Sequence, residues 1–485
     1  QEKLMNHRMI FSIVGRLMVA LAILLLLPFA VAIYFGEVCA WAFAVTIGAS
    51  LIGGTLLALV FRTRNHIIYA REGLAIVALV WVVVSLVGAL PFYLSGEIPS
   101  YIDAFFETVS GFTTTGASIL KNVEGLSKSL LFWRSFTHWI GGMGVLVFVM
   151  ALIPNLSDRS IHLMRAEMPG PIVGKLVPRV KDTAKILYLI YIGMTLLEIL
   201  MLCIGGMPLF DSVLHAFGTA GTGGFGIKSD SIAGYTPYLQ WVIAIFMLLF
   251  GVNFNLYYLF LIRRFKSALK SAELWLYLGI AAGSVAVITA DIYPICKNFE
   301  EALRLSGFQV SSILTTTGYA TADFNLWPDL SKAVLFLLMF CGGCSGSTAG
   351  GLKVSRSLLL FRMVRREIKR MLHPRSVTTV QLEGKTVDDA TISGVGTYFA
   401  LYIFCIMAVF LILSLEPFGM ETNFSAAVSC FNNVGPGFAA VGPVSSYADF
   451  SVLSKITLSA AMLLGRLEIY PLLIAVLPPV WLRNR

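Results

Sequence analysis

Four short segments of the sequence close on glycine after small or hydroxyl-bearing residues. Backbone carbonyl and hydroxyl oxygens can replace the water around a monovalent cation, and glycine tolerates the backbone angles that aim consecutive carbonyl groups at one axis. Four such segments in one chain could therefore build a fourfold ring of cation ligands. The segments are Thr114-Thr115-Gly116-Ala117-Ser118, Gly221-Thr222-Gly223-Gly224-Phe225, Thr316-Thr317-Gly318-Tyr319-Ala320 and Asn433-Val434-Gly435-Pro436-Gly437.

The recurring glycines, about one hundred residues apart, indicate an internal repeat. We align them as Gly116, Gly223, Gly318 and Gly435. The last segment is similar to the Thr-Val-Gly-Tyr-Gly of potassium-channel filters. A single segment of this kind, on its own, would be interpreted as an ordinary loop. The predicted potassium ligands are Thr114, Thr115, Gly116, Thr222, Gly223, Thr316, Thr317, Gly318, Asn433, Val434 and Gly435.

A short helix is predicted before each glycine segment. Asp103, Asp211, Ser306 and Asn423 precede the aligned glycines by 12 or 13 residues and could cap these helices. About ten residues then follow, which gives a helix of roughly 15 Å, half the thickness of a membrane. We therefore expect re-entrant half-helices whose partially negative C-terminal ends favour a cation at the membrane centre.

The remaining sequence is typical of a polytopic helical membrane protein without a soluble domain. The 485 residues are 57% hydrophobic and 13% charged, whereas soluble domains carry about 25% charged residues. Apolar runs long enough to cross a bilayer recur along the whole chain. The predicted spans are 14–35, 40–61, 74–94, 130–153, 186–206, 238–262, 274–293, 333–363, 394–415 and 452–482.

Each glycine segment lies between two predicted spans, which gives an all-α fold of four span–pore loop–span units in a pseudo-fourfold arrangement. Two extra N-terminal helices precede the first unit. The predicted boundaries are 1–70 for this two-helix extension and 71–155, 156–266, 267–375 and 376–485 for the four units.

Charge asymmetry predicts the orientation. Lys and Arg concentrate at the N-terminus, in 62–71, 159–185, 263–270 and 353–385, and at the C-terminal end. The positive-inside rule makes these segments cytoplasmic, together with both termini. The opposite side is rich in acidic residues, which either forms a negative vestibule or reflects the lack of a bias against acids there.

The span at 333–363 is predicted to break in the middle. Residues 341–351 contain five glycines, each about 0.8–1.0 kcal/mol worse than alanine in a helix. We predict a gating loop below the glycine segments, although close helix packing through small residues is an alternative. Its residues are Gly342, Gly343, Ser345, Gly346, Ser347, Thr348, Gly350 and Gly351.

Arg466 falls in the middle of the last predicted span. A charge at that depth is costly and should face the bundle interior or water. Glu468 is two residues away and points to another side of a helix. We interpret Arg466 as a cationic constriction that controls ion flux, and the alternative is a structural ion pair with Glu198.

Taken together, these features resemble the Trk/Ktr/HKT superfamily of potassium transporters over nearly the whole chain, and most of all the membrane subunit of bacterial Trk systems. The resemblance rests on the N-terminal extension, Thr113-Thr114-Thr115-Gly116, Asn432-Asn433-Val434-Gly435-Pro436-Gly437 and the broken helix at 341–351. It implies potassium uptake through the bacterial inner membrane, with potassium as the transported ligand and no covalent cofactor, and it matches 341–351 to an intramembrane gating loop.

The same resemblance implies a homodimer with a separate cytosolic regulatory subunit, called TrkA, which binds NAD and, in some members, ATP. The sequence has no Gly-x-Gly-x-x-Gly after a strand and no P-loop lysine motif, so the nucleotide site is expected on that other polypeptide. Membrane lipid is an expected partner and nucleic acid is not. The basic run Arg362, Arg365, Arg366, Lys369 and Arg370 could dock a partner or anionic lipid, and the positive-inside bias explains it equally well.

Two other classes of protein are alternatives to a gated pore. A secondary carrier with broken helices explains the glycine-rich break but not four half-helices. Gly343-Cys344-Ser345-Gly346 matches the Gly-x-Ser-Gly of rhomboid-type proteases, but His373, in a basic stretch, is the only histidine after it. A serine without a base is not activated, so an enzyme is not expected.

Overall fold

The computed structural model describes residues 6–63, 70–144, 180–375, 378–383 and 385–477. These residues are mostly helical, as predicted. One strand pair departs from the all-α expectation: β1 (Gln381–Leu382) pairs antiparallel with β2 (Lys385–Thr386), with Gln381 opposite Thr386.

Within the described ranges, six stretches of helix are long and apolar enough to cross a membrane: His7–Tyr34, Ala40–Val60, Glu72–Leu94, Lys185–Ile204, Ala272–Ile295 and Asp389–Leu413. They coincide with six predicted spans. They contain α1 (His7–Leu24), α2 (Leu26–Tyr34), α3 (Ala40–Val60), α4 (Ala70–Gly88), α5 (Leu90–Leu94), α10 (Val180–Ile204), α15 (Ala272–Ile292) and α19 (Asp389–Leu413).

The other four predicted spans begin with shorter helices of 13–15 residues. The predicted span 130–153 begins with α7 (Lys128–Gly142), and its end lies outside the described residues. The predicted break after residue 341 is present, between α17 (Asp329–Cys341) and α18 (Val354–Leu372).

Two spans predicted to be continuous are broken. In 238–262, α12 (Pro237–Phe250) and α13 (Phe254–Leu261) meet at 91°, because Asn253 starts a new helix by accepting the N–H of Asn255 at 2.9 Å. In 452–482, α21 (Val452–Arg466) and α22 (Tyr470–Val476) are separated by Glu468 and Ile469, both with positive φ.

The four predicted half-helices are α6 (Tyr101–Phe112), α11 (Leu209–Gly221), α16 (Phe299–Leu314) and α20 (Met420–Phe431), with 12, 13, 16 and 12 residues. The predicted caps were wrong. Ser100 and Asn298 cap α6 and α16, while α11 and α20 follow Pro208 and Gly419 without a side-chain cap. Asp103, Asp211 and Asn423 lie in the first turn of their helices instead, and Ser306 lies within α16.

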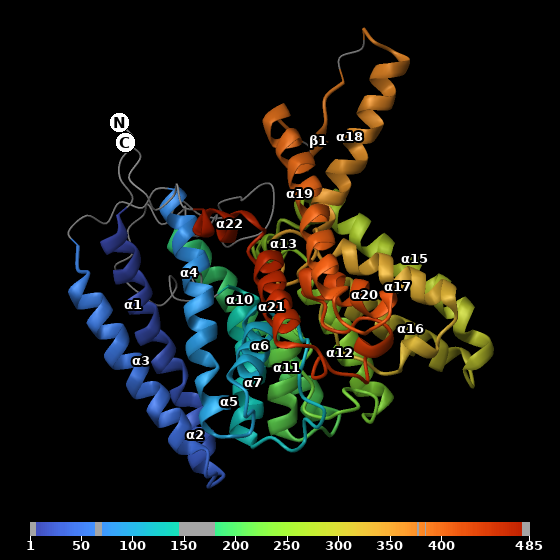
Figure 1. Cartoon of the computed structure of the whole chain (residues 1–485). Coiled ribbons are helices and arrows are strands. Elements are labelled where there is room, and N and C mark those ends of the chain that lie inside the picture. Colours follow the sequence, from blue (N-terminus) through green and yellow to red (C-terminus); the bar gives the residue numbers. More distant parts are fainter. Residues whose placement is uncertain (1–5, 64–69, 145–179, 376–377, 384, 478–485) are drawn as a thin grey trace.

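The half-helices pack among the shorter helices in the centre of the molecule, where α6 contacts α7 and α21, α11 contacts α7, α16 contacts α12 and α20 contacts α21. In Figure 1, α1 and α3 lie at one edge of the helical body, and α18 projects from it beside β1 and one end of α19. Short α14 (Phe265–Leu269) connects α13 to α15.

Candidate cation site

The four glycine segments share one backbone conformation. One residue at or next to the start of each segment has a left-handed φ. These residues are Thr114 at 54°, Thr222 at 54°, Thr316 at 56° and Asn433 at 56°. Two residues later comes a glycine with positive φ: Gly116 at 81°, Gly224 at 73°, Gly318 at 87° and Gly435 at 101°. Between them, the N–H groups of Thr115, Gly223, Thr317 and Val434 donate to the half-helix carbonyl groups of Ser110, Gly218, Ser312 and Ser429 at 2.8–2.9 Å.

This shared conformation corrects the alignment of the second segment by one residue. Gly224, not Gly223, is the counterpart of Gly116, and Gly223 takes the place of Thr115. Gly223 is also required, because a Cβ there would collide with the ring of His138. The sequence offered both glycines of the doublet, and only the hydrogen bond back to Gly218 decides between them.

The segments touch one another in a closed cycle. A Cβ placed on each positive-φ glycine would come within 3.0 Å of the middle carbonyl oxygen of the next segment, so these positions exclude any larger residue. The contacts run from Gly116 to Gly223, from Gly224 to Thr317, from Gly318 to Val434 and from Gly435 to Thr115. The arrangement brings all the sequence-predicted ligand residues into one ring of backbone.

Oxygen is the candidate ligand type in this ring. Among the described residues, no group of three His, Cys, Asp or Glu side chains could hold a metal ion. The segments offer backbone carbonyl groups and the hydroxyl groups of their threonines instead. Such neutral oxygen ligands suit a monovalent cation that has lost its hydration shell.

A cavity of about 440 Å³ opens on the glycine side of the ring, lined by Gly116, Gly224, Gly318 and Gly435. Its charged lining residues are Lys121, Arg134, Lys228 and Asp449, and Lys121 pairs with Asp449 at 2.6 Å. Among the described residues, the lining of the cavity is therefore not acidic, and of the two alternatives for the acidic outer side, a negative vestibule is not observed in this cavity.

Glu124 connects two of the loops around this cavity by hydrogen bonds. Its carboxylate accepts the backbone N–H and the hydroxyl of Ser229, both at 2.9 Å. The backbone hydrogen bond, followed by the hydroxyl bond, holds the pKa of Glu124 below its ordinary value of 4.5. The loop after the first glycine segment is thus joined to the loop after the second.

The glycine-rich loop between α17 and α18 contacts the ring from the opposite side. The N–H of Gly350 donates to the hydroxyl of Thr316 at 2.7 Å, and the N–H of Gly351 donates to the carbonyl of Asn432 at 3.1 Å. Gly342, Gly346 and Gly351 have positive φ. This loop is irregular, as predicted, and it is hydrogen-bonded to the third and fourth segments.

Polar groups from neighbouring helices fix the rest of the loop. Ser345 donates its N–H to Glu273 of α15 at 2.6 Å, and the hydroxyl of Thr348 donates to the carbonyl of Phe250 at 3.3 Å. Ser347 bonds within the loop, to Cys344. Gly343 packs against Ala349. Glu273 was not identified from the sequence, because its partner lies 72 residues away.

Arg466 is the last residue of α21 rather than a residue in the middle of a helix. Its guanidinium donates to the carbonyl of Thr348 in the glycine-rich loop at 2.8 Å. It also donates to the carbonyls of Gly141 and Gly142 at the end of α7, at 2.5 and 2.7 Å. The helix C-terminus adds a favourable negative partial charge.

The alternative ion pair of Arg466 is not observed. Among the described residues, Glu198 belongs to no ion pair, and Glu468 pairs with Arg356 through two bonds of 2.5 and 3.0 Å. A cavity of about 40 Å³ is lined by residues of the glycine-rich loop together with Arg466, Lys353 and Glu468.

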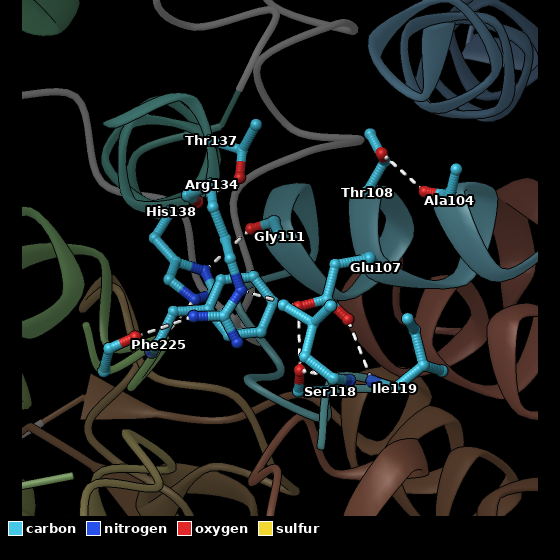
Figure 2. A network of polar contacts seen from close by, with 12 residues as sticks. Ala104, Glu107, Thr108, Gly111, Ser118, Ile119, Arg134, Thr137, His138 and Phe225 are labelled. Carbon is cyan, nitrogen blue, oxygen red and sulfur yellow. Dashed lines mark hydrogen bonds and ion pairs between the residues drawn. The ribbon is translucent and has the colours of Figure 1, made fainter. Parts of the chain in front are cut away.

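A buried ion pair supports the first two segments from behind (Figure 2). Glu107 of α6 accepts from Arg134 of α7 at 2.6 Å, from the hydroxyl of Ser118 at 2.9 Å and from the N–H of Ile119 at 3.0 Å. Arg134 also donates to the carbonyl of Gly226 at 2.8 Å. From the sequence, Glu107 and Arg134 were assigned only to the outer side of the membrane. Their ion pair was not predicted, because the two residues lie 27 positions apart.

His138 completes this support (Figure 2). Its Nδ1 lies 2.8 Å from the carbonyl of Gly111, and its Nε2 accepts the N–H of Phe225 at 3.3 Å, so the neutral ring protonated at Nδ1 satisfies both contacts. The guanidinium of Arg134 stands 3.5 Å from the centre of the Phe225 ring. The ring of His138 thus fills the space that Gly223 leaves open.

Comparison with known proteins places this architecture. The chain is 36% identical over 484 residues to the Trk system potassium uptake protein TrkH of Salmonella typhimurium, covering 98% of this chain and 100% of that protein. It is also 36% identical to the Trk system potassium uptake protein TrkG of Escherichia coli K12, with 96% and 97% coverage. These relatives are named as transport proteins and not as enzymes.

A solved structure agrees with the fold. The crystal structure of the potassium transporter TrkH from Vibrio parahaemolyticus superposes with a TM-score of 0.87 at 32% identity, covering 98% of this chain and 100% of that one. Residues 41–479 match the family described as TrkH, cation transport protein. The chain therefore belongs to the TrkH family of cation transport proteins.

Proposed function

We propose that this chain takes up potassium across the bacterial inner membrane through a gated pore lined by the four glycine segments. The closed cycle of contacts among Gly116, Gly224, Gly318 and Gly435 carries the proposal, because it gives four carbonyl-bearing strands one common centre. The similarity to potassium uptake proteins over nearly the whole chain supports it.

In this proposal the segments act as a selectivity filter. Potassium would exchange its water for backbone carbonyl oxygens and threonine hydroxyls, and the C-terminal ends of α6, α11, α16 and α20 would add negative partial charge. The four segments differ in sequence, so fewer well-formed ion sites are expected than in a filter with four identical strands. The predicted filter residues gain Gly224 as a further member.

The four-unit arrangement is part of the proposal. Its boundaries remain 71–155, 156–266, 267–375 and 376–485, after the two-helix extension in 1–70. Each half-helix is followed by a helix of 13–15 residues, namely α7, α12, α17 and α21. This matched sequence of elements supports the pseudo-fourfold repeat.

Flux would be controlled by the glycine-rich loop 341–351 together with Arg466. The loop is hydrogen-bonded to Thr316 of the proposed filter and to Asn432, which directly precedes the fourth segment, and Arg466 bonds the loop to the end of α7. A guanidinium about 4 Å from a potassium ion repels it by roughly 4 kcal/mol at an effective dielectric constant near 20. Displacement of the loop and of Arg466 would lower this barrier.

The cellular setting follows from the same proposal. The distribution of Lys and Arg supports cytoplasmic termini in the inner membrane. The relatives are named as parts of Trk systems, which supports a separate TrkA-like cytosolic subunit that binds NAD and, in some members, ATP. A homodimer in contact with membrane lipid completes the proposed assembly.

A secondary carrier is the second candidate, because the breaks at 251–253 and 467–469 add to the one at 342–353. Recording from the purified chain in planar bilayers distinguishes the two functions. A gated pore gives unitary currents with a reversal potential set by potassium over sodium, whereas a carrier gives slow, saturable flux without unitary events.

Filter variants test the site itself. Gly224→Ser and Gly435→Ser should lower the potassium-over-sodium permeability ratio by about tenfold, the equivalent of roughly 1.4 kcal/mol. Gly283→Ser in α15 is the matched control, because a Cβ there meets nothing within 4 Å. An unchanged ratio in both filter variants would contradict the filter assignment.

A further inference from the structure

The last turns of α18 carry a stripe of positive charge. Arg362, Arg365, Arg366 and Lys369 are spaced at i, i+3, i+4 and i+7, which places them on one face of the helix. Together with Lys270 they line a cleft of about 420 Å³ between α18, the start of α15 and the segment that leads into β1. Thr378 and Thr379 add hydroxyl groups to the same cleft.

The cleft has few negative charges of its own. Among the described residues, Glu383 is the one carboxylate in its lining, and it already accepts from the hydroxyl of Ser271 at 3.0 Å and from the N–H of Glu273 at 3.3 Å. Its charge therefore compensates the N-terminal end of α15.

Within the part of the chain that the structure describes, the side chains of three of the five cations have no ion pair or hydrogen bond. Arg366 pairs with Glu367 and Asp389, and Arg362 donates to the carbonyl of Gln381. The side chains of Lys270, Arg365 and Lys369 take part in none of the ion pairs and hydrogen bonds formed within the described part of the chain. Like charges at this spacing repel one another, so an anion in the cleft would relieve the repulsion.

The cleft lies at the end of a candidate membrane span. Lys270 comes two residues before Ala272, where the span that runs to Ile295 begins. Trp275, one turn into that span, is 60% exposed, and exposed tryptophans are typical of the membrane–water interface. A span that begins at Ala272 would place the cleft at the depth where the phosphate groups of a bilayer lie.

We propose that this cleft binds a phosphate-bearing anion, supplied either by the headgroup of an anionic lipid or by a soluble phosphate. Arginine matches phosphate with paired N–H donors, and the lysines and threonines supply single donors around it. The inference uses the membrane placement of α15 but not the proposed ion pathway, so its test reads binding and not flux.

The test compares the double variant Arg365→Gln/Lys369→Gln with the matched control Lys266→Gln/Arg370→Gln, in which two exposed residues outside the cleft lining lose the same charge. Native mass spectrometry of the purified full chain measures retention of phosphatidylglycerol. Thermal unfolding in inorganic phosphate, against chloride at equal ionic strength, measures binding of soluble phosphate. Melting temperatures without either ligand check that both variants are folded.

The cleft variant should bind its ligand about thirtyfold more weakly, the factor for two basic residues at about 1 kcal/mol each. The control should change by less than about threefold, as expected for a general charge effect. Loss of phosphatidylglycerol alone identifies a lipid headgroup as the source, and loss of the phosphate response identifies a soluble phosphate. Equal binding by the cleft variant and the control, or no binding of either probe by the unaltered chain, overturns the proposal.

Discussion

Replacement of Arg466 by alanine should raise ion flux through the purified chain. The guanidinium holds Thr348 of the glycine-rich loop on one side and Gly141 and Gly142 of α7 on the other, through bonds of 2.5–2.8 Å. Alanine removes both the charge and this connection. The change therefore tests whether Arg466 closes the pathway or only stabilises the fold.

The expected size of the effect follows from the cavity beside Arg466, whose volume is about 40 Å³. An ion there stands about 4 Å from the guanidinium, which costs roughly 4 kcal/mol at an effective dielectric constant near 20, or up to about a thousandfold in rate. Lys353 lines the same cavity and keeps its position in the variant. We therefore expect a rise of about tenfold or more, because part of the repulsion remains.

Uptake of rubidium into proteoliposomes measures the flux, and elution volume with melting temperature checks that the variant is folded. Arg466→Lys separates the two contributions, because it keeps the charge but loses the fork that binds three carbonyl groups. If charge controls flux, the lysine variant stays close to the unaltered chain. Unchanged or reduced flux in a folded alanine variant would refute the reasoning, and equal increases in both variants would assign the effect to the lost connection alone.

Three further predictions concern the surroundings of the ring. Glu107→Gln leaves a buried guanidinium without its carboxylate and should cost about 3–5 kcal/mol of stability, so an unchanged melting temperature in detergent would contradict the supporting role of this pair. Gly350→Ala places a Cβ 2.5 Å from the carbonyl of Asn432, which should displace the loop from the ring and increase the basal leak of rubidium. A leak equal to that of the unaltered chain would contradict the idea that contact between the loop and the ring closes the pore. Glu124 has a lowered pKa, so its bonds to Ser229 stabilise the outer loops fully above pH 4.5 and less as the pH falls through the folded-state pKa. Glu124→Gln should therefore flatten the fall in melting temperature between pH 7 and pH 3, and identical pH profiles would show that this contact adds nothing.

Local sequence was enough to predict the half-helices, the six long spans and the break after residue 341. Apolar runs and closely spaced glycines predict these features to within a few residues of their observed positions. The breaks before Asn253 and after Arg466 were missed, because they depend on one capping side chain and on two residues, Glu468 and Ile469, that rarely adopt positive φ.

The contacts within the site were less predictable, because they join residues far apart in sequence. Arg466 was interpreted as a cationic constriction, with an ion pair to Glu198 as the alternative, but its bonds to carbonyl groups more than 100 residues away were not predicted. Likewise, Glu107 and Arg134 form their pair only when α6 packs against α7. The choice between Gly223 and Gly224 depended on the backbone conformation of the segment and on its hydrogen bond back to Gly218, which a glycine doublet alone does not reveal.

The contacts among the glycine segments form a directed cycle within one polypeptide, and the single chain gives this cycle a property that an assembly of four identical subunits lacks. A side chain added at Gly224 strikes the segment of Thr317, while one added at Gly318 strikes the segment of Val434. Because all four segments belong to one polypeptide, a single substitution deforms one quarter of the ring and leaves three contacts as they were. Serine placed at one, two, three and then four of these glycines would give a graded series of variants. The number of distorted positions in the ring would then be fixed by the sequence of the chain and not by mixing different subunits.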